Sequence, residues 1–237
     1  MGDASEAVRP MFKPLPPEVE RARVIAAGVL LVTTIIAAFL IVTRPKPPEA
    51  LRTDRLTEFA GNVGECRRAL AQAGFEAPRA EDVSEGARCG YRNAVTLSAS
   101  PIGFSEAPTT NCALAAALVL WQRDVVAPAA ERHLGQAVAR IEMGGPAYAC
   151  RPVAGRRDGR MSEHARANAI DISGFTLADG RVLAVRGGWR GAAGERRFLR
   201  AVRDGACERF RTVLSPDYNR AHADHLHLDM GGYALCR

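Results

Sequence analysis

The chain has 237 residues, enough for one sizeable domain with extensions but not for several domains. Apolar residues make up 47% and charged residues 24%, the composition of a globular protein with a core rather than of a disordered chain. The formal net charge of +6 suits anionic partners such as a cell-wall polymer, a membrane surface or a nucleic acid. Because the charge is spread along the chain without a basic tract, it selects none of these partners.

The N-terminal part is expected to form a tail, an anchor and a linker. Residues 1–23 contain four prolines and mixed charges, which predicts a disordered cytosolic tail. Residues 24–43 form a run of 20 uncharged residues, long enough for a transmembrane helix. The alternatives are a buried helix of a soluble domain, or a cleaved signal peptide, although no A-x-A cleavage site follows the run. Residues 44–52 are a short proline-rich linker.

The cysteines indicate on which side of the membrane the domain lies. All six follow the apolar run, and none has the C-x-x-C spacing of a metal site. An even number on one side of an anchor suggests disulfides formed in an oxidising compartment, the alternative being buried free thiols. We therefore predict a single-pass inner-membrane protein with its domain in the periplasm. Cys207 and Cys236 are expected to pair near the site, and the rest of the pairing stays open.

The folded domain is expected to occupy residues 53–237 and to begin with helices. A first helix is predicted from about Asp54 to Ala73, with Thr53 as its N-cap and Gly74 just past its end. Residues 75–110 are rich in Gly, Pro and Ser, which predicts loops and brief strands.

A long helix should follow from Asn111 to Gly135, bent at Pro128. Helical spacing in this segment puts apolar residues, Trp121 among them, on one core-facing side.

The second half of the domain has the pattern of strands. Apolar alternation or short apolar runs predict strands over 137–143, 167–175, 181–187 and 225–230. Between them, residues 195–210 read as an amphipathic helix with Phe198, Leu199, Val202 and Phe210 turned inward. Trp189 is expected in the core and His133 at the surface. We predict an α+β fold, with helices packed on a mostly antiparallel sheet that carries a metal site.

Histidines cluster near the C-terminus, in the run HADHLHLD. His222, His225 and His227 fall within six residues, and His164 lies seven residues before Asp171. Alternate residues of a strand face the same side, so His225 and His227 should project together. Asp171 stands between two isoleucines, where an unpaired carboxylate is costly to bury unless a cation compensates it.

Together these residues predict a catalytic metal site. His164, Asp171 and His227 would form a His₂Asp set with one open coordination position, for which zinc is the expected ion. His225 would act as the general base, and His222 would bind the substrate or stabilise a developing oxyanion. The alternative is that these side chains are structural or lie at the surface without a shared role.

Two motifs support a family resemblance. SEHARANAID resembles the S-x-H-x-x-G-x-A-x-D motif of D-Ala-D-Ala-type metallopeptidases, the group that includes lysostaphin-like enzymes and the hedgehog domain. HADHLHLD has the H-x-x-H-x-H spacing of the murein endopeptidases in that group. Over roughly 60–237 the chain is most similar to the bacterial extensin-like C-terminal domain family. The stretches that carry this similarity are YACR, SEHARANAIDISGF, DGACERFRTVLSPDYN and HADHLHLD.

The resemblance implies a zinc peptidase that acts on peptidoglycan peptides. By matched position it makes His164, Asp171 and His227 the zinc ligands and His225 the base. It also implies that Ser162 positions the substrate and that Arg151 holds a substrate carboxylate or carbonyl.

The chain departs from the motifs at two places. Ala167 replaces the motif glycine, and we expect it to need only a compatible backbone angle. The Glu-x-x-His base of the dipeptidase branch is absent; Asp224 could serve instead, but its shorter reach favours His225. Asp229 would orient a metal ligand or form a plain salt bridge.

The predicted function is therefore hydrolysis of amide bonds in peptidoglycan stem peptides or cross-links, with a D-alanyl bond favoured by the resemblance. The alternative is a non-catalytic wall-binding or scaffolding module whose metal is structural. Peptidoglycan and the inner membrane are the expected partners. Nucleic-acid binding is not expected, because no such motif is present and the predicted compartment is wrong for it. A regulatory protein is conceivable, but no segment indicates one.

Overall fold

A computed structural model describes residues 16–19, 22, 25–30, 32, 51, 56, 58–155 and 159–237. The chain divides into two units, Met1–Lys46 and Pro47–Arg237. In the first unit the described residues from 17 onward are helical and exposed. The predictions of a tail over 1–23, an anchor over 24–43 and a linker over 44–52 lie largely outside the described residues.

One helical run in the described part is long and apolar enough to cross a membrane, and it belongs to the second unit. It covers Cys112–Leu134, 23 residues, and 72% of its apolar window is buried inside the protein. Such burial is what the core helix of a folded domain shows.

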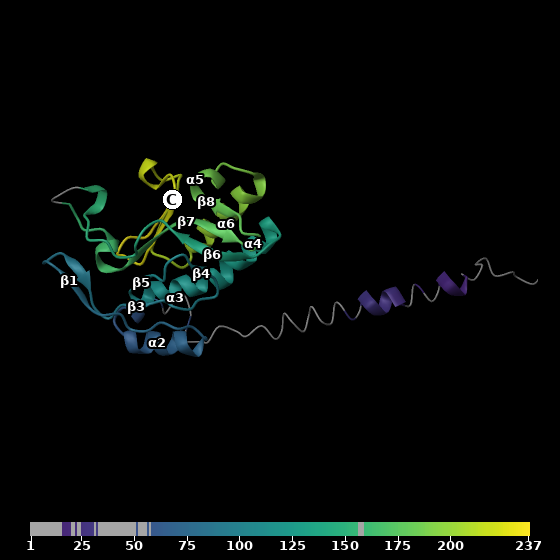
Figure 1. Ribbon diagram of the computed structural model, residues 1–237, viewed down its shortest axis with the longest axis horizontal. Coiled ribbons are helices and arrows are strands. Elements are labelled where there is room, and N and C mark those ends of the chain that lie inside the picture. The colour runs from purple at the N-terminus through teal and green to yellow at the C-terminus, as the bar shows by residue number, and fades with distance from the viewer. Residues whose placement is uncertain are drawn as a thin grey trace, which may run out of the picture. The chain divides into compact units, whose positions relative to one another are not determined.

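A mixed sheet forms the centre of the second unit, with strand order β11-β9-β10-β7-β6-β4 and β8 paired to β7 (Figure 1). Pairing is antiparallel around the central strand β7 and parallel only for β4–β6 and β11–β9. The mostly antiparallel α+β architecture is thus confirmed. The strands of this sheet are β4 (Gly103–Phe104), β6 (Val138–Met143), β7 (Ala169–Leu177), β8 (Val182–Ala184), β9 (Thr212–Leu214), β10 (Leu226–Asp229) and β11 (Leu235–Cys236).

Two short strand pairs occupy the segment predicted to hold loops and brief strands. They are β1 (Val83–Glu85) with β2 (Cys89–Tyr91), and β3 (Val95–Thr96) with β5 (Thr109–Thr110). In the segment 181–187 the predicted strand is wrong after Ala184. There the chain turns into a short helix, α5 (Val185–Gly188), because two adjacent glycines do not sustain a strand.

The first helix is shorter than predicted. Helix α2 spans Val63–Gln72, and the Asn62 side chain accepts a hydrogen bond from the Glu65 amide at its N-terminus. A 3₁₀ turn, η2 (Glu58–Ala60), precedes it. The prediction of a continuous helix from Asp54 is therefore wrong between Glu58 and Asn62. Asparagine favours the cap position over the helix interior, which explains the later start. The predicted end is confirmed, since Gly74 follows with φ +84°.

The long helix begins and ends where the sequence predicts. Asn111 caps helix α3 (Cys112–Trp121), and Gly135 ends α4 (Ala127–Leu134) with a left-handed φ of +66°. The irregularity lies upstream of Pro128, in a π-helical turn, η3 (Gln122–Val126). Because proline lacks an amide hydrogen and crowds the preceding turn, the wider turn accommodates it. All of α3 is buried, so the prediction of one core-facing side is too narrow.

The core lies between the sheet and helices α3 and α6. Helix α6 spans Ala193–Ala206, and its predicted inward residues Phe198, Leu199 and Val202 are buried; Phe210 is buried too, but beyond the helix end. Phe175 of β7 packs edge-on against Phe198, with ring centroids 5.0 Å apart. Trp121 is fully buried as predicted, and its Nε1–H donates to the Val202 carbonyl at 2.9 Å.

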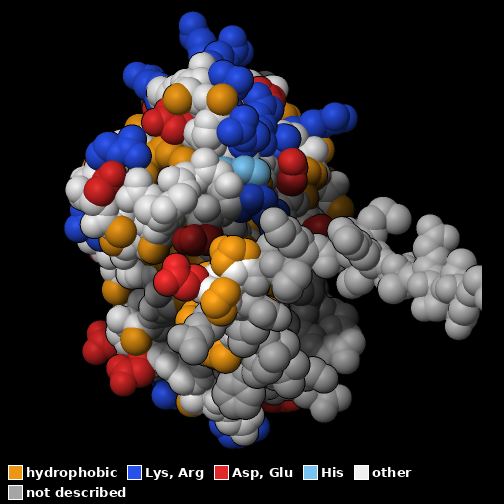
Figure 2. Space-filling view, turned by 90° about the vertical axis from the view of Figure 1, so that its right-hand side faces the viewer, with side chains coloured by type: hydrophobic (Ala, Val, Ile, Leu, Met, Phe, Trp, Pro, Cys, Tyr) orange, Lys and Arg blue, Asp and Glu red, His pale blue; other side chains and the backbone are white. Residues whose placement is uncertain are grey.

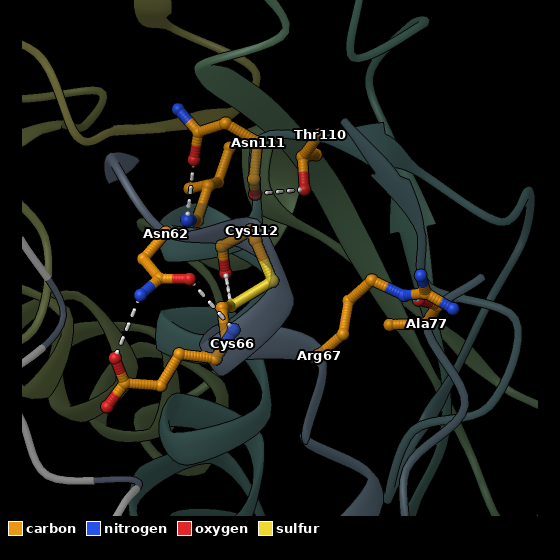
Figure 3. The surroundings of a disulfide bond; sticks show 9 residues. Asn62, Cys66, Arg67, Ala77, Thr110, Asn111 and Cys112 are labelled. Carbon is orange, nitrogen blue, oxygen red and sulfur yellow. Dashed lines mark hydrogen bonds between the residues drawn. A yellow bond between two sulfur atoms is a disulfide. The ribbon is translucent and has the colours of Figure 1, made fainter. Parts of the chain in front are cut away.

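Three disulfides connect the elements, and all six cysteines take part. The pairs are Cys66–Cys112, Cys89–Cys150 and Cys207–Cys236, so the predicted C-terminal pair is confirmed. Figure 3 shows the first pair, which joins α2 to the start of α3 beside both asparagine caps. This covalent link fixes two helix N-termini to each other.

The basic character of the chain is visible at the surface. On the face shown in Figure 2, arginine side chains gather in the upper part around a histidine, with few Asp and Glu side chains between them. This face of the second unit therefore carries an excess of positive charge.

Candidate metal centre

The central sheet brings two of the predicted ligands face to face. Strands β10 and β7 run antiparallel with His227 directly opposite Asp171, so both side chains project from the same face. His164 lies in a short 3₁₀ turn, η5 (Glu163–Arg166), just before β7. The turn ends at Ala167, whose φ of +51° is left-handed. Ala167, at the position of the motif glycine, therefore adopts a left-handed backbone angle that glycine would also adopt, as expected.

The three predicted ligands form a compact cluster. Their ligand atoms all lie within 4.8 Å of one another. His164 Nε2 is 3.2 Å from Asp171 Oδ2, and His227 Nδ1 is 2.9 Å from Asp171 Oδ1. The two histidine nitrogens are 3.3 Å apart. His164 is 1% exposed and Asp171 8%, so the cluster is shielded from bulk water.

Outer hydrogen bonds orient both imidazoles. His164 Nδ1 lies 3.2 Å from the Ala147 carbonyl oxygen, which can only accept, so Nδ1 carries the hydrogen and the Nε2 lone pair faces the cluster. His227 Nε2 lies 3.0 Å from the buried carboxylate of Asp229, which fixes a hydrogen there and leaves Nδ1 facing inward. Asp229 thus orients a ligand, one of the two roles predicted for it. Metal-ligating histidines typically have such outer partners.

The electrostatics of the cluster favour an inward-facing cation. Two lone pairs 3.3 Å apart beside a carboxylate repel one another unless a proton or a metal lies between them. Burial would raise the pKa of Asp171, but hydrogen bonds with His164 and His227 hold it far below its usual range. Burial would lower the pKa of His227, but hydrogen bonds with Asp171 and Asp229 raise it to about 9. In the metal-free chain a proton on His227 therefore compensates Asp171.

A family comparison places these residues in a known domain type. The family model described as extensin-like protein C-terminus matches residues 64–237. The chain belongs to this family. No curated protein and no solved structure matches the chain significantly. The match covers the part from α2 to the C-terminus, including all the predicted site residues.

Two further histidines of the extensin-like domain, His225 and His222, flank the cluster on its outer side. His225 Nε2 is 3.7 Å from Asp171 Oδ1, while its Nδ1 is 2.9 Å from Asp224 Oδ1. His225 is the residue just before β10, and it faces the same side as His227, as predicted. Its Nε2 is thus directed at the cluster and its other nitrogen is engaged by Asp224.

His222 is farther from the cluster and is neutral. It ends the 3₁₀ turn η6 (Arg220–His222), with its ring 5.1 Å from that of His225 and 6.0 Å from that of His227. Its Nδ1 is 2.8 Å from Asn219 Oδ1. Burial first, and then the electrostatic effect of the neighbouring His225 and His227 imidazoles, lowers the pKa of His222 to about 4. At neutral pH this imidazole can donate or accept a hydrogen bond but carries no charge.

Arg151 and Ser162, implied by the resemblance, lie at the edge of the cluster. An Arg151 guanidinium nitrogen is 3.5 Å from Asp171 Oδ2, and 58% of its side chain is exposed. It can therefore meet an incoming carbonyl or carboxylate. The Ser162 hydroxyl oxygen lies 3.4 Å from the His164 amide as the cap of η5, and the Ser162 amide donates to the Arg151 carbonyl. Ser162 thus orders the turn that carries His164.

A hollow that the sequence analysis did not predict opens beside His225. It measures about 350 Å³ and is lined by residues of β6, β7, β8 and α5 together with Asp224 and His225. The glycine in AIDISGF is the signal that could have indicated it, since glycine within a strand often marks a bulge.

Proposed function

We propose that the extensin-like domain is a zinc-dependent peptidase of the bacterial cell envelope, which hydrolyses amide bonds in peptidoglycan stem peptides or cross-links. The observation that carries the proposal is the convergence of His164 Nε2, Asp171 and His227 Nδ1, with both imidazole hydrogens directed outward. This arrangement presents three electron-pair donors to a single point.

The donor set fits zinc. Two imidazole nitrogens and one carboxylate are a ligand set of catalytic zinc, which leaves a position open for water or substrate. A zinc ion held by these residues would polarise a carbonyl oxygen and lower the pKa of water toward neutrality. The outer contacts with Ala147 and Asp229 would hold the ligands in place when the ion enters.

The remaining side chains supply the acid–base chemistry and the substrate contacts. His225 directs Nε2 at the cluster, where it can take a proton from the attacking water and later deliver it to the leaving amine. The Arg151 guanidinium can bind the substrate carbonyl as negative charge develops on its oxygen. Neutral His222 can donate a hydrogen bond to the same region. Asp224 is already hydrogen-bonded to His225, which supports the choice of His225 as base.

The choice of substrate is supported by the sequence rather than by the geometry. The S-x-H and H-x-x-H-x-H motifs resemble those of D-Ala-D-Ala-type metallopeptidases and murein endopeptidases. Three disulfides and a basic surface suit work on an anionic wall polymer outside the cytoplasm. We also propose an inner-membrane anchor over residues 24–43, because this run is uncharged and long enough to span a bilayer.

The test is digestion of purified peptidoglycan and its muropeptides by the zinc-loaded chain, with mass spectrometry of the products. His227→Ala should lose both zinc and activity, because it removes a ligand. His225→Ala should keep zinc and lose at least about a hundredfold in turnover, since general-base catalysis contributes on that scale. Full activity in His225→Ala would refute the base assignment.

The rival function is wall binding with a structural metal. The depth of the cluster favours it, because a ligand as buried as His164 can serve folding alone. This function predicts zinc and peptidoglycan binding in both the wild type and His225→Ala, with no product from any muropeptide.

A further inference from the structure

The hollow beside His225 is a trough on the sheet face that carries the metal cluster. We define the trough by Gly144, Ser173, Gly174, Ala184, Arg186 and His225, which line it together with neighbouring side chains. Strands β7 and β8 and helix α5, which contribute several of these residues, lie close together in Figure 1. His225 is one of the lining residues, so the trough borders the proposed base.

A bulge in β7 creates the trough. Met143 pairs with Ile172 while Glu142 pairs with Gly174, so β7 holds one extra residue, Ser173, against β6. The Ser173 hydroxyl lies within hydrogen-bond distance of the Glu142 and Met143 carbonyls, at 3.2 and 3.0 Å. The extra residue resets the alternation of the strand. Asp171 can then face the cluster while Phe175, four residues later, packs into the core.

The floor of the trough is almost free of side chains. A Cβ on Gly174 would lie 2.8 Å from the Leu183 carbonyl oxygen, and one on Gly144 would lie 3.2 Å from Asp171 Cβ. Ala184, directly opposite Gly174, contributes only an exposed methyl group. Such a floor admits the backbone of another chain, but the methyl group and the sheet surface leave little depth for a long side chain.

The polar groups around the trough are already paired within the protein. Glu142 bonds Arg140 and Thr176, and Asp224 bonds His225. Arg186 is the exception: its side chain is 75% exposed and its contact with Asp224 is a loose 3.6 Å. A ligand here gains mainly from short apolar groups over the floor and from one acceptor that reaches Arg186.

We propose that the trough binds the part of the substrate next to the scissile amide, as an extended peptide segment. The residue over Gly174 and Ala184 has a side chain no larger than that of alanine, and a carbonyl or carboxylate of the segment meets Arg186. This inference rests on the proposed peptidase function and assigns its substrate class and specificity-determining residues.

The test compares Ala184→Phe with the matched control Ala178→Phe in the full-length chain. Ala178 is an exposed alanine just after β7 and outside the trough. With a muropeptide substrate, Ala184→Phe should lower kcat/KM at least tenfold, mainly through KM, while zinc content stays at the wild-type value. Ala178→Phe should stay within twofold of the wild type. If Ala184→Phe impairs folding, Val182→Trp fills the same trough from a position that is 61% exposed.

The outcomes separate the two proposals. Wild-type kcat/KM in folded Ala184→Phe or Val182→Trp overturns the trough and leaves the peptidase function standing. If the zinc-loaded wild type cleaves no muropeptide, the proposed peptidase function is refuted. Equilibrium dialysis with the same muropeptide then tests whether the trough binds it. If the wild type binds the muropeptide and the trough variants do not, the result supports the trough proposal. If the wild type does not bind, or the variants bind equally well, the trough proposal is overturned.

Discussion

At the residue scale, the candidate centre depends on which nitrogen of each imidazole carries a hydrogen. The ligand set could be predicted from motif spacing, because His164, Asp171 and His227 lie at fixed positions in two short stretches. The two outer hydrogen-bond partners differ in how far the sequence predicts them. Asp229 can be predicted, because it follows His227 by two residues in a strand, whereas no sequence pattern indicates the Ala147 carbonyl. A backbone acceptor is defined only by the fold.

Asp229→Asn should weaken zinc binding by roughly ten- to a hundredfold, because it removes the charge that fixes the His227 hydrogen on Nε2. Competition titration against a chromophoric chelator measures the change. Asp179→Asn, at an exposed carboxylate that bonds Arg181 and Gln136, is the matched control and should leave the zinc affinity unchanged. Equal affinity in both variants would show that Asp229 does not support the centre.

The zinc affinity should rise with pH between about 6.5 and 9. The raised pKa of His227, about 9, means that the metal-free chain holds a proton where zinc must bind. That proton stabilises the metal-free fold fully below the unfolded pKa of 6.5, and the contribution is lost as pH rises through 9. Calorimetry at pH 7.5 in buffers of different ionisation enthalpy should record about one proton released per zinc. Release of no proton would contradict the protonated His227.

At the scale of elements, the sequence predicts the kinds of element well and their details less well. The strands and the long helix follow from periodicity and caps, since Asn111 and Gly135 carry signals that act locally. The π-helical turn and the bulge at Ser173 do not, because both adjust one element to its neighbours. The bulge matters most, because it lets one strand place Asp171 in the metal cluster and Phe175 in the core.

Gly174→Ala should destabilise the domain by about 1–3 kcal/mol, because the added Cβ would meet the Leu183 carbonyl at 2.8 Å and push β8 away. Gly103→Ala in β4 is the control, since no atom lies within 4 Å of its added Cβ, and it should change stability by less than about 0.5 kcal/mol. Chemical denaturation of both variants gives the comparison. Equal stability would mean that the bulge is not packed as described.

At the scale of the whole molecule, the three disulfides join segments that are far apart in the chain. An oxidising compartment can be inferred from the number and placement of the cysteines, but the pairing is a tertiary property, and the sequence indicates only Cys207–Cys236. Cys66–Cys112 joins the first and second helices across 46 residues. The predictions for residues 24–43 depend on composition alone and remain predictions.

Replacing Cys66 and Cys112 together by alanine should lower the free energy of unfolding by about 4 kcal/mol, the loop-closure value for a segment of this length. Denaturation curves of the oxidised wild type and the double variant measure it. The variant should still bind zinc, since neither cysteine belongs to the cluster. Loss of zinc in a variant that remains folded would show that the centre depends on this link.

The most direct test of the metal centre is X-ray absorption at the zinc edge of the purified full-length chain, together with its zinc content. We predict one zinc per chain, bound only by nitrogen and oxygen at about 2.0–2.2 Å, and its absence in His227→Ala. A chain that takes up no zinc at neutral pH, or one whose zinc has sulfur ligands or survives in His227→Ala, would contradict the assignment of His164, Asp171 and His227.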